Sequence, residues 1–173
     1  YCYRPTERYP WSETVWHSTQ PSALIQMAVN NIYVTNAVWH TAEMAIADNW
    51  DSVYGNAANR KRLVLQAGAT YTLSSVNNTT DAANGLPAIT SNIQIIGNGA
   101  TIARSSAVGT PAFRLFYITN SGSLSVINAT LANGSSTDGG AIFNSSGSMR
   151  LENSTFVNNT ASGFGGAVMV DFN

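Results

Sequence analysis

The chain contains 173 residues, which is enough for one domain or for one domain with an extension. Only 10% of the residues are charged, and the formal net charge is −1 at pH 7. This composition excludes an overall positive field that would draw the chain to nucleic acid or to an anionic membrane, and the hydrophobic content of 44% with a low net charge argues against a disordered chain.

Residues 1–62 differ in composition from the rest of the chain. They hold all four tryptophans, both histidines and the only lysine, whereas all six phenylalanines lie in residues 63–173. We therefore divide the sequence into an aromatic-rich N-terminal extension with a helical cap (1–62) and a β-rich region (63–173).

Within the extension, residues 22–52 carry apolar side chains at helical spacing. Pro21 suits the first position of a helix, and the pattern predicts one broken helix or two short ones that cap one end of the core. Polar residues such as Asn30 and Glu43 interrupt the run, so we expect no transmembrane span. The apolar residues of the stripe are Leu24, Ile25, Ala28, Val29, Ile32, Val38, Trp39, Ala42, Ala45 and Ile46.

The dipeptide Trp-His occurs twice in the extension, as Trp16-His17 and Trp39-His40. Histidine is a common metal ligand, so a metal or pigment site is one interpretation. The two histidines lack the cysteine or carboxylate spacing of known metal motifs, which favours partly buried, hydrogen-bonded side chains. We expect no metal and no other cofactor.

Two further features of the extension have simple interpretations. The single cysteine, Cys2, excludes an internal disulfide, and we interpret it as an incidental thiol, with pairing to another chain as the alternative. The cluster Arg60-Lys61-Arg62 is interpreted as a solvated junction between the two regions. Phosphate binding and protease cleavage are the alternatives for that cluster.

The β-rich region combines many Gly, Asn, Ser and Thr residues with β-branched residues. Such a mixture disfavours long helices and suits short strands joined by tight turns. The only charged residues after position 62 are Arg104, Arg114, Arg150, Asp81, Asp138, Glu152 and Asp171.

A repeat of about 25 residues runs through the second half of this region. Residues 122–133 align with residues 147–158, and every matched pair is 25 positions apart. A second element, Gly139-Gly140-Ala141-Ile142, returns 26 positions later as Gly165-Gly166-Ala167-Val168. The aligned pairs of the first element are Gly122 with Gly147, Leu124 with Met149, Val126 with Leu151, Asn128 with Asn153, Thr130 with Thr155, Leu131 with Phe156, and Asn133 with Asn158.

A constant offset of this length predicts a solenoid of short strands, in which each coil lies about 4.8 Å from the next. Leu124 would lie over Met149 in an apolar ladder. Asn128 would lie over Asn153 in an inward amide ladder at a bend. A β-sandwich is the alternative, but it does not require matched Gly, Asn and Thr at one offset.

These motifs resemble the GGA(I/L/V) and FxxN repeats of polymorphic outer membrane proteins. The resemblance is carried by Gly139–Ile142, Phe156-Val157-Asn158-Asn159 and Gly165–Val168. Residues 63–170 look like bacterial right-handed parallel β-helix surface proteins. The resemblance implies an all-β, right-handed parallel β-helix that is secreted or exposed on the bacterial outer surface, often as the passenger of an adhesin-like protein. It implies no catalytic residues.

An enzyme is the main functional alternative, because polysaccharide lyases and hydrolases also use parallel β-helices. Glycoside hydrolysis needs two carboxylates at a defined separation, and no coil supplies such a pair. Lys61, the only lysine, lies outside the coils. We therefore expect no catalytic residue, although a fragment of a polysaccharide-active enzyme remains an alternative.

The sequons at Asn77, Asn78, Asn128, Asn133, Asn144, Asn153 and Asn158 are interpreted as structural.

The sequence favours a non-enzymatic structural or adhesive scaffold. We expect its last coil to lack a cap and to be covered by other subunits or by further repeats of the same protein. Surface glycans are the other expected partners, and nucleic acid is not. Alternatively, the chain is a subunit of a larger assembly that docks through aromatic residues of its extension, because Tyr and Trp dominate interface hot spots. The candidate docking residues are Tyr3, Tyr9, Trp11 and Trp16.

Overall fold

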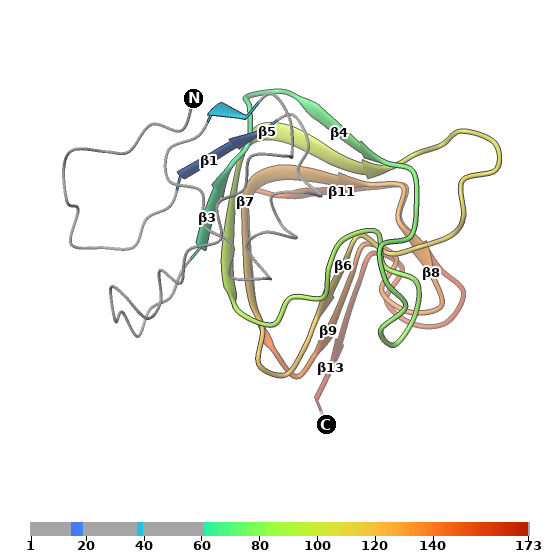
Figure 1. Cartoon of the computed structure of the whole chain (residues 1–173). Coiled ribbons are helices and arrows are strands. Elements are labelled where there is room, and N and C mark those ends of the chain that lie inside the picture. The colour runs from blue at the N-terminus through green and yellow to red at the C-terminus, as the bar shows by residue number, and fades with distance from the viewer. Residues whose placement is uncertain (1–14, 19–37, 40–60, 173) are drawn as a thin grey trace.

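The computed structural model describes residues 15–18, 38–39 and 61–172, with side chains from residue 63 onward (Figure 1). Every regular element in these ranges is a strand. The strands are β1 (Val15–Ser18), β2 (Val38–Trp39), β3 (Lys61–Val64), β4 (Thr70–Leu73), β5 (Asn92–Arg104), β6 (Phe116–Ile118), β7 (Ser123–Ala132), β8 (Ser135–Ser136), β9 (Ile142–Ser145), β10 (Ser148–Glu152), β11 (Thr155–Val157), β12 (Thr160–Ala161) and β13 (Val168–Asp171).

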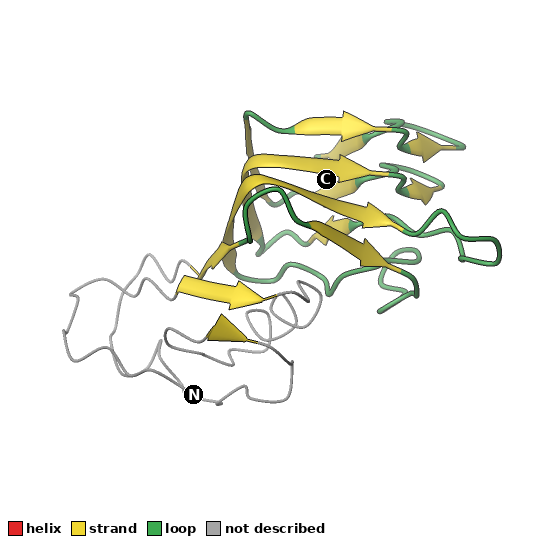
Figure 2. Ribbon diagram, turned by 90° about the horizontal axis from the view of Figure 1, so that it is seen from above, coloured by secondary structure: helices red, strands yellow, loops and turns green. Residues whose placement is uncertain are grey.

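The strands form three sheets, and all pairings between these strands are parallel. The largest sheet has the order β10-β7-β5-β3-β1-β2, with β11 beside β7 and β4 beside β5. The other two have the orders β12-β8 and β13-β9-β6. Figure 2 shows successive passes of the chain stacked in rows. The antiparallel pairing of a β-sandwich is absent from the named strands.

The register of the strands confirms the offsets predicted from the sequence. Met149 pairs with Leu124, and Thr155 pairs with Thr130, each 25 positions apart. Val168 pairs with Ile142, 26 positions apart. Equivalent residues of the repeat therefore lie on neighbouring strands, and their side chains form columns.

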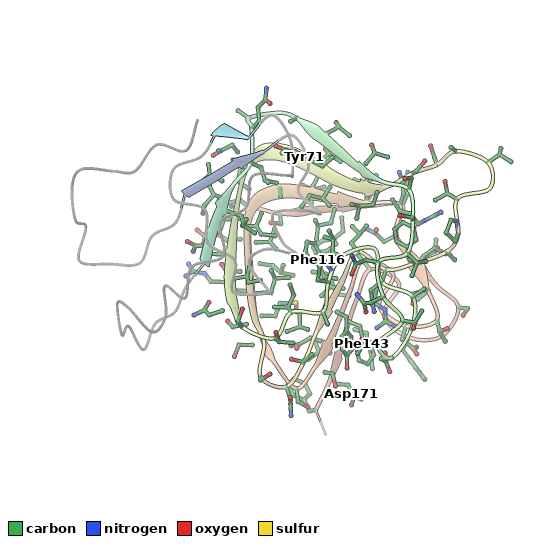
Figure 3. All side chains as sticks on the ribbon, in the orientation of Figure 1. Tyr71, Phe116, Phe143 and Asp171 are labelled. Carbon is green, nitrogen blue, oxygen red and sulfur yellow. The ribbon has the colours of Figure 1, made fainter. Side chains whose placement is uncertain are left out.

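Side chains alternate between the interior and the outer surface, as the two-residue period of a strand requires. In β4 the alternation is regular, because Tyr71 and Leu73 are buried while Thr70 and Thr72 are exposed. Figure 3 shows Phe116, on β6, in the interior between the sheets, where it is 0% exposed. The largest apolar members of this core are Phe113, Phe116, Leu63, Leu86, Ile89, Ile93, Ile95 and Ile102.

The asparagines of the repeat lie at bends, but not as predicted. Asn128 and Asn153 have positive φ angles of 53° and 48°, and both side chains are exposed. The predicted inward amide ladder is therefore wrong. Asparagine tolerates left-handed backbone better than most residues, so the repeat uses it to bend the chain within β7 and between β10 and β11, which all belong to the largest sheet. The buried amide in this part is Asn144, which hydrogen-bonds to the backbone N–H and C=O of Gly147.

This backbone role predicts opposite results for two substitutions of Asn128. Asn128→Val should lower the free energy of unfolding by about 1–2 kcal/mol, because a β-branched residue enters the left-handed region at that cost. Asn128→Gly should change it much less, since glycine adopts this conformation freely. Urea titration followed by circular dichroism measures both. Equal destabilisation by the two variants would show that the asparagine side chain, not the backbone conformation, is required.

The extension departs from its predicted helical structure at the residues that the structure describes. Val38–Trp39 forms strand β2, which pairs with β1, so the helix predicted over residues 22–52 is wrong at these two positions. Val and Trp both favour strands, and pairing with an existing strand outweighs the helical spacing. The rest of that range lies outside the described residues. Helices able to cross a membrane are not found in the described part of the chain.

Candidate functional site

A groove of about 520 Å³ lies beside the short strands β8 and β12. Its walls carry only small side chains, and none of them is charged. Serine and threonine residues, whose hydroxyls both donate and accept hydrogen bonds, line it together with alanines. The lining residues are Ala82, Ala83, Ala112, Ser135, Ser136, Thr137, Thr160, Ala161 and Ser162.

One side of the groove is fixed by the pairing of β8 with β12. Thr160 and Ala161 of β12 lie in register with Ser135 and Ser136 of β8. Asn159 holds the two coils together, because its Oδ1 accepts from the backbone N–H of Gly134 at 2.8 Å and its Nδ2 donates to the carbonyl of Leu131 at 2.9 Å. Asn159 ends the segment 156–159, so the FxxN motif has a structural role here.

The far wall of the groove belongs to the loop 77–84, which folds around a buried amide. The Nδ2 of Asn84 lies 2.8–2.9 Å from three acceptors, the Oδ1 of Asn78 and the carbonyls of Thr80 and Ala82, which share its two hydrogens. The carbonyl of Ala83 accepts from the backbone N–H of Arg114 at 3.1 Å. These contacts hold Ala82 and Ala83 against the rest of the fold.

Arg114 attaches the same loop through its side chain. Its guanidinium is 1% exposed and lies 3.2 Å from the Oδ2 of Asp81, with the Phe143 ring centroid 4.8 Å away. Phe143 stacks on Tyr117, the neighbouring aromatic of β6. Burial lowers the pKa of the Arg114 guanidinium, while the charge of Asp81 and its hydrogen bond act in the opposite direction. This cluster is not predictable from the sequence, because neither the spacing nor the composition marks Arg114 as buried.

Three of the four carboxylates after position 62, those of Asp81, Asp138 and Glu152, each accept a hydrogen bond. Asp81 pairs with Arg114, and Glu152 pairs with Arg150 at 2.7 Å. The Oδ1 of Asp138 accepts from the backbone N–H of Phe164 at 2.7 Å, which fixes the turn beside the groove. Within the described ranges, groups of three or more His, Cys, Asp or Glu with the geometry for a metal ion are not found.

A second uncharged surface covers the outer side of β4, β5, β7 and β11. Thr70, Thr101, Thr130 and Thr155 lie in register on these four strands and form one column. The 25-residue repeat predicts the pair Thr130 and Thr155 but not the two earlier members, because the offset between β5 and β7 is not 25. A smaller hollow of about 160 Å³ lies over β5, β7 and β10 of the same sheet. It is lined by Asn92, Gln94, Ser123, Leu124, Ser125, Ser148, Met149 and Arg150.

Most residues singled out in the extension fall outside the described ranges. Tyr3, Tyr9, Trp11, Cys2 and His40 lie there, so the docking and ligand interpretations stay predictions. Trp16 belongs to β1, where its backbone pairs with Leu63 of β3. His17 is next to it and pairs with Val38. Lys61 and Arg62 open strand β3.

Comparisons of the chain with models of known protein families, with curated proteins and with solved structures found no match in any of the three.

Proposed function

We propose that residues 63–173 form a right-handed parallel β-helix with the N-terminal extension as its cap. Three observations support this: parallel pairing of the named strands, register offsets of 25 and 26 residues, and left-handed asparagines at the bends. Strand connections between parallel neighbours are almost always right-handed, which supports the hand. The GGA(I/V) and FxxN segments support a relationship to polymorphic outer membrane protein-like surface proteins.

The function we infer is that of a non-enzymatic, secreted or cell-surface scaffold on the bacterial outer surface, which contacts neutral glycans. The observation that carries this proposal is the groove beside β8 and β12. Its hydroxyls are held by paired backbone, so little conformational entropy is lost when a ligand binds. An uncharged, hydroxyl-lined groove fits a neutral polyhydroxyl ligand better than an acidic one.

The surroundings of the carboxylates support the non-enzymatic part of the proposal. Each of Asp81, Asp138 and Glu152 already accepts a hydrogen bond from a structural partner. A general acid and base acting on one glycosidic bond would have to face a common cleft, and no such carboxylate lines the groove. The enzyme-fragment alternative gains no supporting observation.

Binding of neutral polysaccharides tests this function. On a glycan array the intact chain should bind neutral oligosaccharides, and Ser136→Trp, which fills the groove, should weaken that binding about tenfold or more. Thr72→Trp, at an exposed position of β4 that lines neither hollow, is the matched control and should bind like the parent. Equal binding by parent and Ser136→Trp would contradict the groove as the site. Release of shortened glycan products would instead support the enzyme alternative.

A further inference from the structure

The outermost coil of the stack, residues 148–171 with strands β10 to β13, is less buried than the coil beneath it. Leu124, Val126 and Ile142 are at most 1% exposed. Their register partners in the outermost coil are Met149, Leu151 and Val168, and these are only partly buried although they occupy the same inward columns. Phe156, above the buried Leu131, shows the same difference.

The backbone of the two coils shows a second difference. In the inner coil the N–H groups of Gly139 and Ala141 donate to the carbonyls of Phe164 and Ala167, at 3.0 Å and 2.8 Å. The N–H of Gly140 donates to the carbonyl of Gly165 at 3.4 Å. The equivalent donors of the outermost coil, on Gly165, Gly166 and Ala167, have no acceptor among the described residues. Backbone N–H donors in folded proteins are ordinarily paired. The N–H groups of Gly165, Gly166 and Ala167 therefore lack the neighbouring segment of backbone carbonyls that the inner coil has.

A glycine supplies the third difference. A Cβ on Gly140 would lie 2.3 Å from the carbonyl oxygen of Gly166 and 2.4 Å from that of Thr160, so the next coil excludes any side chain there. Gly166, the equivalent residue 26 positions later, has nothing within 4 Å of the same point among the described residues. Its φ is not in the left-handed region, so backbone conformation does not require glycine either.

We propose that the outermost coil is a docking surface for one further coil of the same repeat, joined directly after β13. This rests on the β-helix of the proposed function. The occupant places apolar side chains over Met149, Leu151 and Phe156 and a backbone carbonyl against Gly166, as Gly166 does against Gly140. The register fits a further coil that follows β13 directly. Asp171 pairs with Ser145, and β10 begins three positions after Ser145, at Ser148, so the next coil would begin three positions after Asp171. A glycan or a metal ion would not supply both the acceptor row and the apolar cover.

The test is an extended chain in which a copy of residues 148–172 follows Asn173. The extended chain should have a Tm higher than that of the parent by at least about 4 °C. A matched extension with serine at the positions copied from Met149, Leu151 and Phe156 should give no increase. Gly166→Ala should leave the Tm of the parent unchanged and should remove the increase in the extended chain. Gly140→Ala should lower the Tm of both chains.

Three results would overturn the proposal. One is an absence of any Tm increase on extension with the intact copy. Another is an increase that survives Gly166→Ala. The third is concentration-dependent dimerisation of the unextended parent through this coil, measured by sedimentation, which would assign the surface to a second copy. None of these readouts depends on glycan binding, so the failure of this proposal is distinguishable from the failure of the proposed groove.

Discussion

Phe116→Ala should lower the free energy of unfolding by about 3–5 kcal/mol, the usual cost of removing a buried aromatic side chain. Phe116 is 0% exposed, and its strand β6 is held by pairing with β9. The surrounding side chains can therefore fill the space left by the removed ring only in part. At roughly 2–4 °C per kcal/mol for a chain of this length, the Tm should fall by about 6–20 °C. Thermal unfolding followed by circular dichroism measures the change.

Phe164→Ala is the matched control for this substitution. Phe164 is 72% exposed, so the same change of side chain should alter the Tm by no more than about 2 °C. If the two variants lose similar stability, the interior between the sheets is not the main apolar core. If Phe116→Ala is tolerated, the position of β6 in the stack is wrong.

The second large effect is expected for Gly122→Ala. A Cβ at this position would lie 2.0 Å from the carbonyl oxygen of Ile89, which is a backbone atom and moves only with the segment that bridges to Ile118. That carbonyl also accepts from the N–H and the hydroxyl of Thr119, both at 3.0 Å, so its displacement weakens two hydrogen bonds. Overpacking costs about 1–3 kcal/mol and each lost hydrogen bond about 1 kcal/mol, which gives a loss of about 3–5 kcal/mol when both bonds are lost.

Gly166→Ala separates this steric effect from a general intolerance of alanine. Neither glycine has a positive φ, and only Gly122 faces backbone within 3 Å. In urea titrations Gly122→Ala should therefore lower the midpoint markedly, and Gly166→Ala should not. A tolerated Gly122→Ala would show that neighbouring coils lie farther apart than described.

The sequence predicted the stacking where the coils are regular in length. The structure pairs Leu124 with Met149 and Thr130 with Thr155, as the 25-residue offset predicts. In a repeat without insertions, the sequence offset between equivalent residues equals the register offset between paired strands. The earlier coil is harder to predict, since Ile93 pairs with Leu124 at an offset of 31 and the register shifts between Ile96 and Ala100. Inserted residues at bends hide such a coil from any search at constant period.

Other features depend on burial, which spacing does not encode. Asn128 was expected inside but is exposed, because the backbone bend and not the amide selects asparagine there. Arg114 is buried because the loop around Asn84 closes over it, a long-range contact with no local signal. The groove beside β8 and β12 combines Ser and Thr residues from two coils with the loop that holds Ala82 and Ala83. Its individual segments resemble ordinary turns.

The stacking of neighbouring coils is tested most directly by disulfide formation between Thr101→Cys and Thr130→Cys in a Cys2→Ser background. These residues are register partners on adjacent parallel strands, about 4.8 Å apart, within the Cα separation that a disulfide accepts. Thr101→Cys with Ala132→Cys, two residues out of register, exceeds that separation and is the control. The structure predicts rapid oxidation of the first pair and little oxidation of the second. Preferential oxidation of the second pair, or of neither, would contradict the stack.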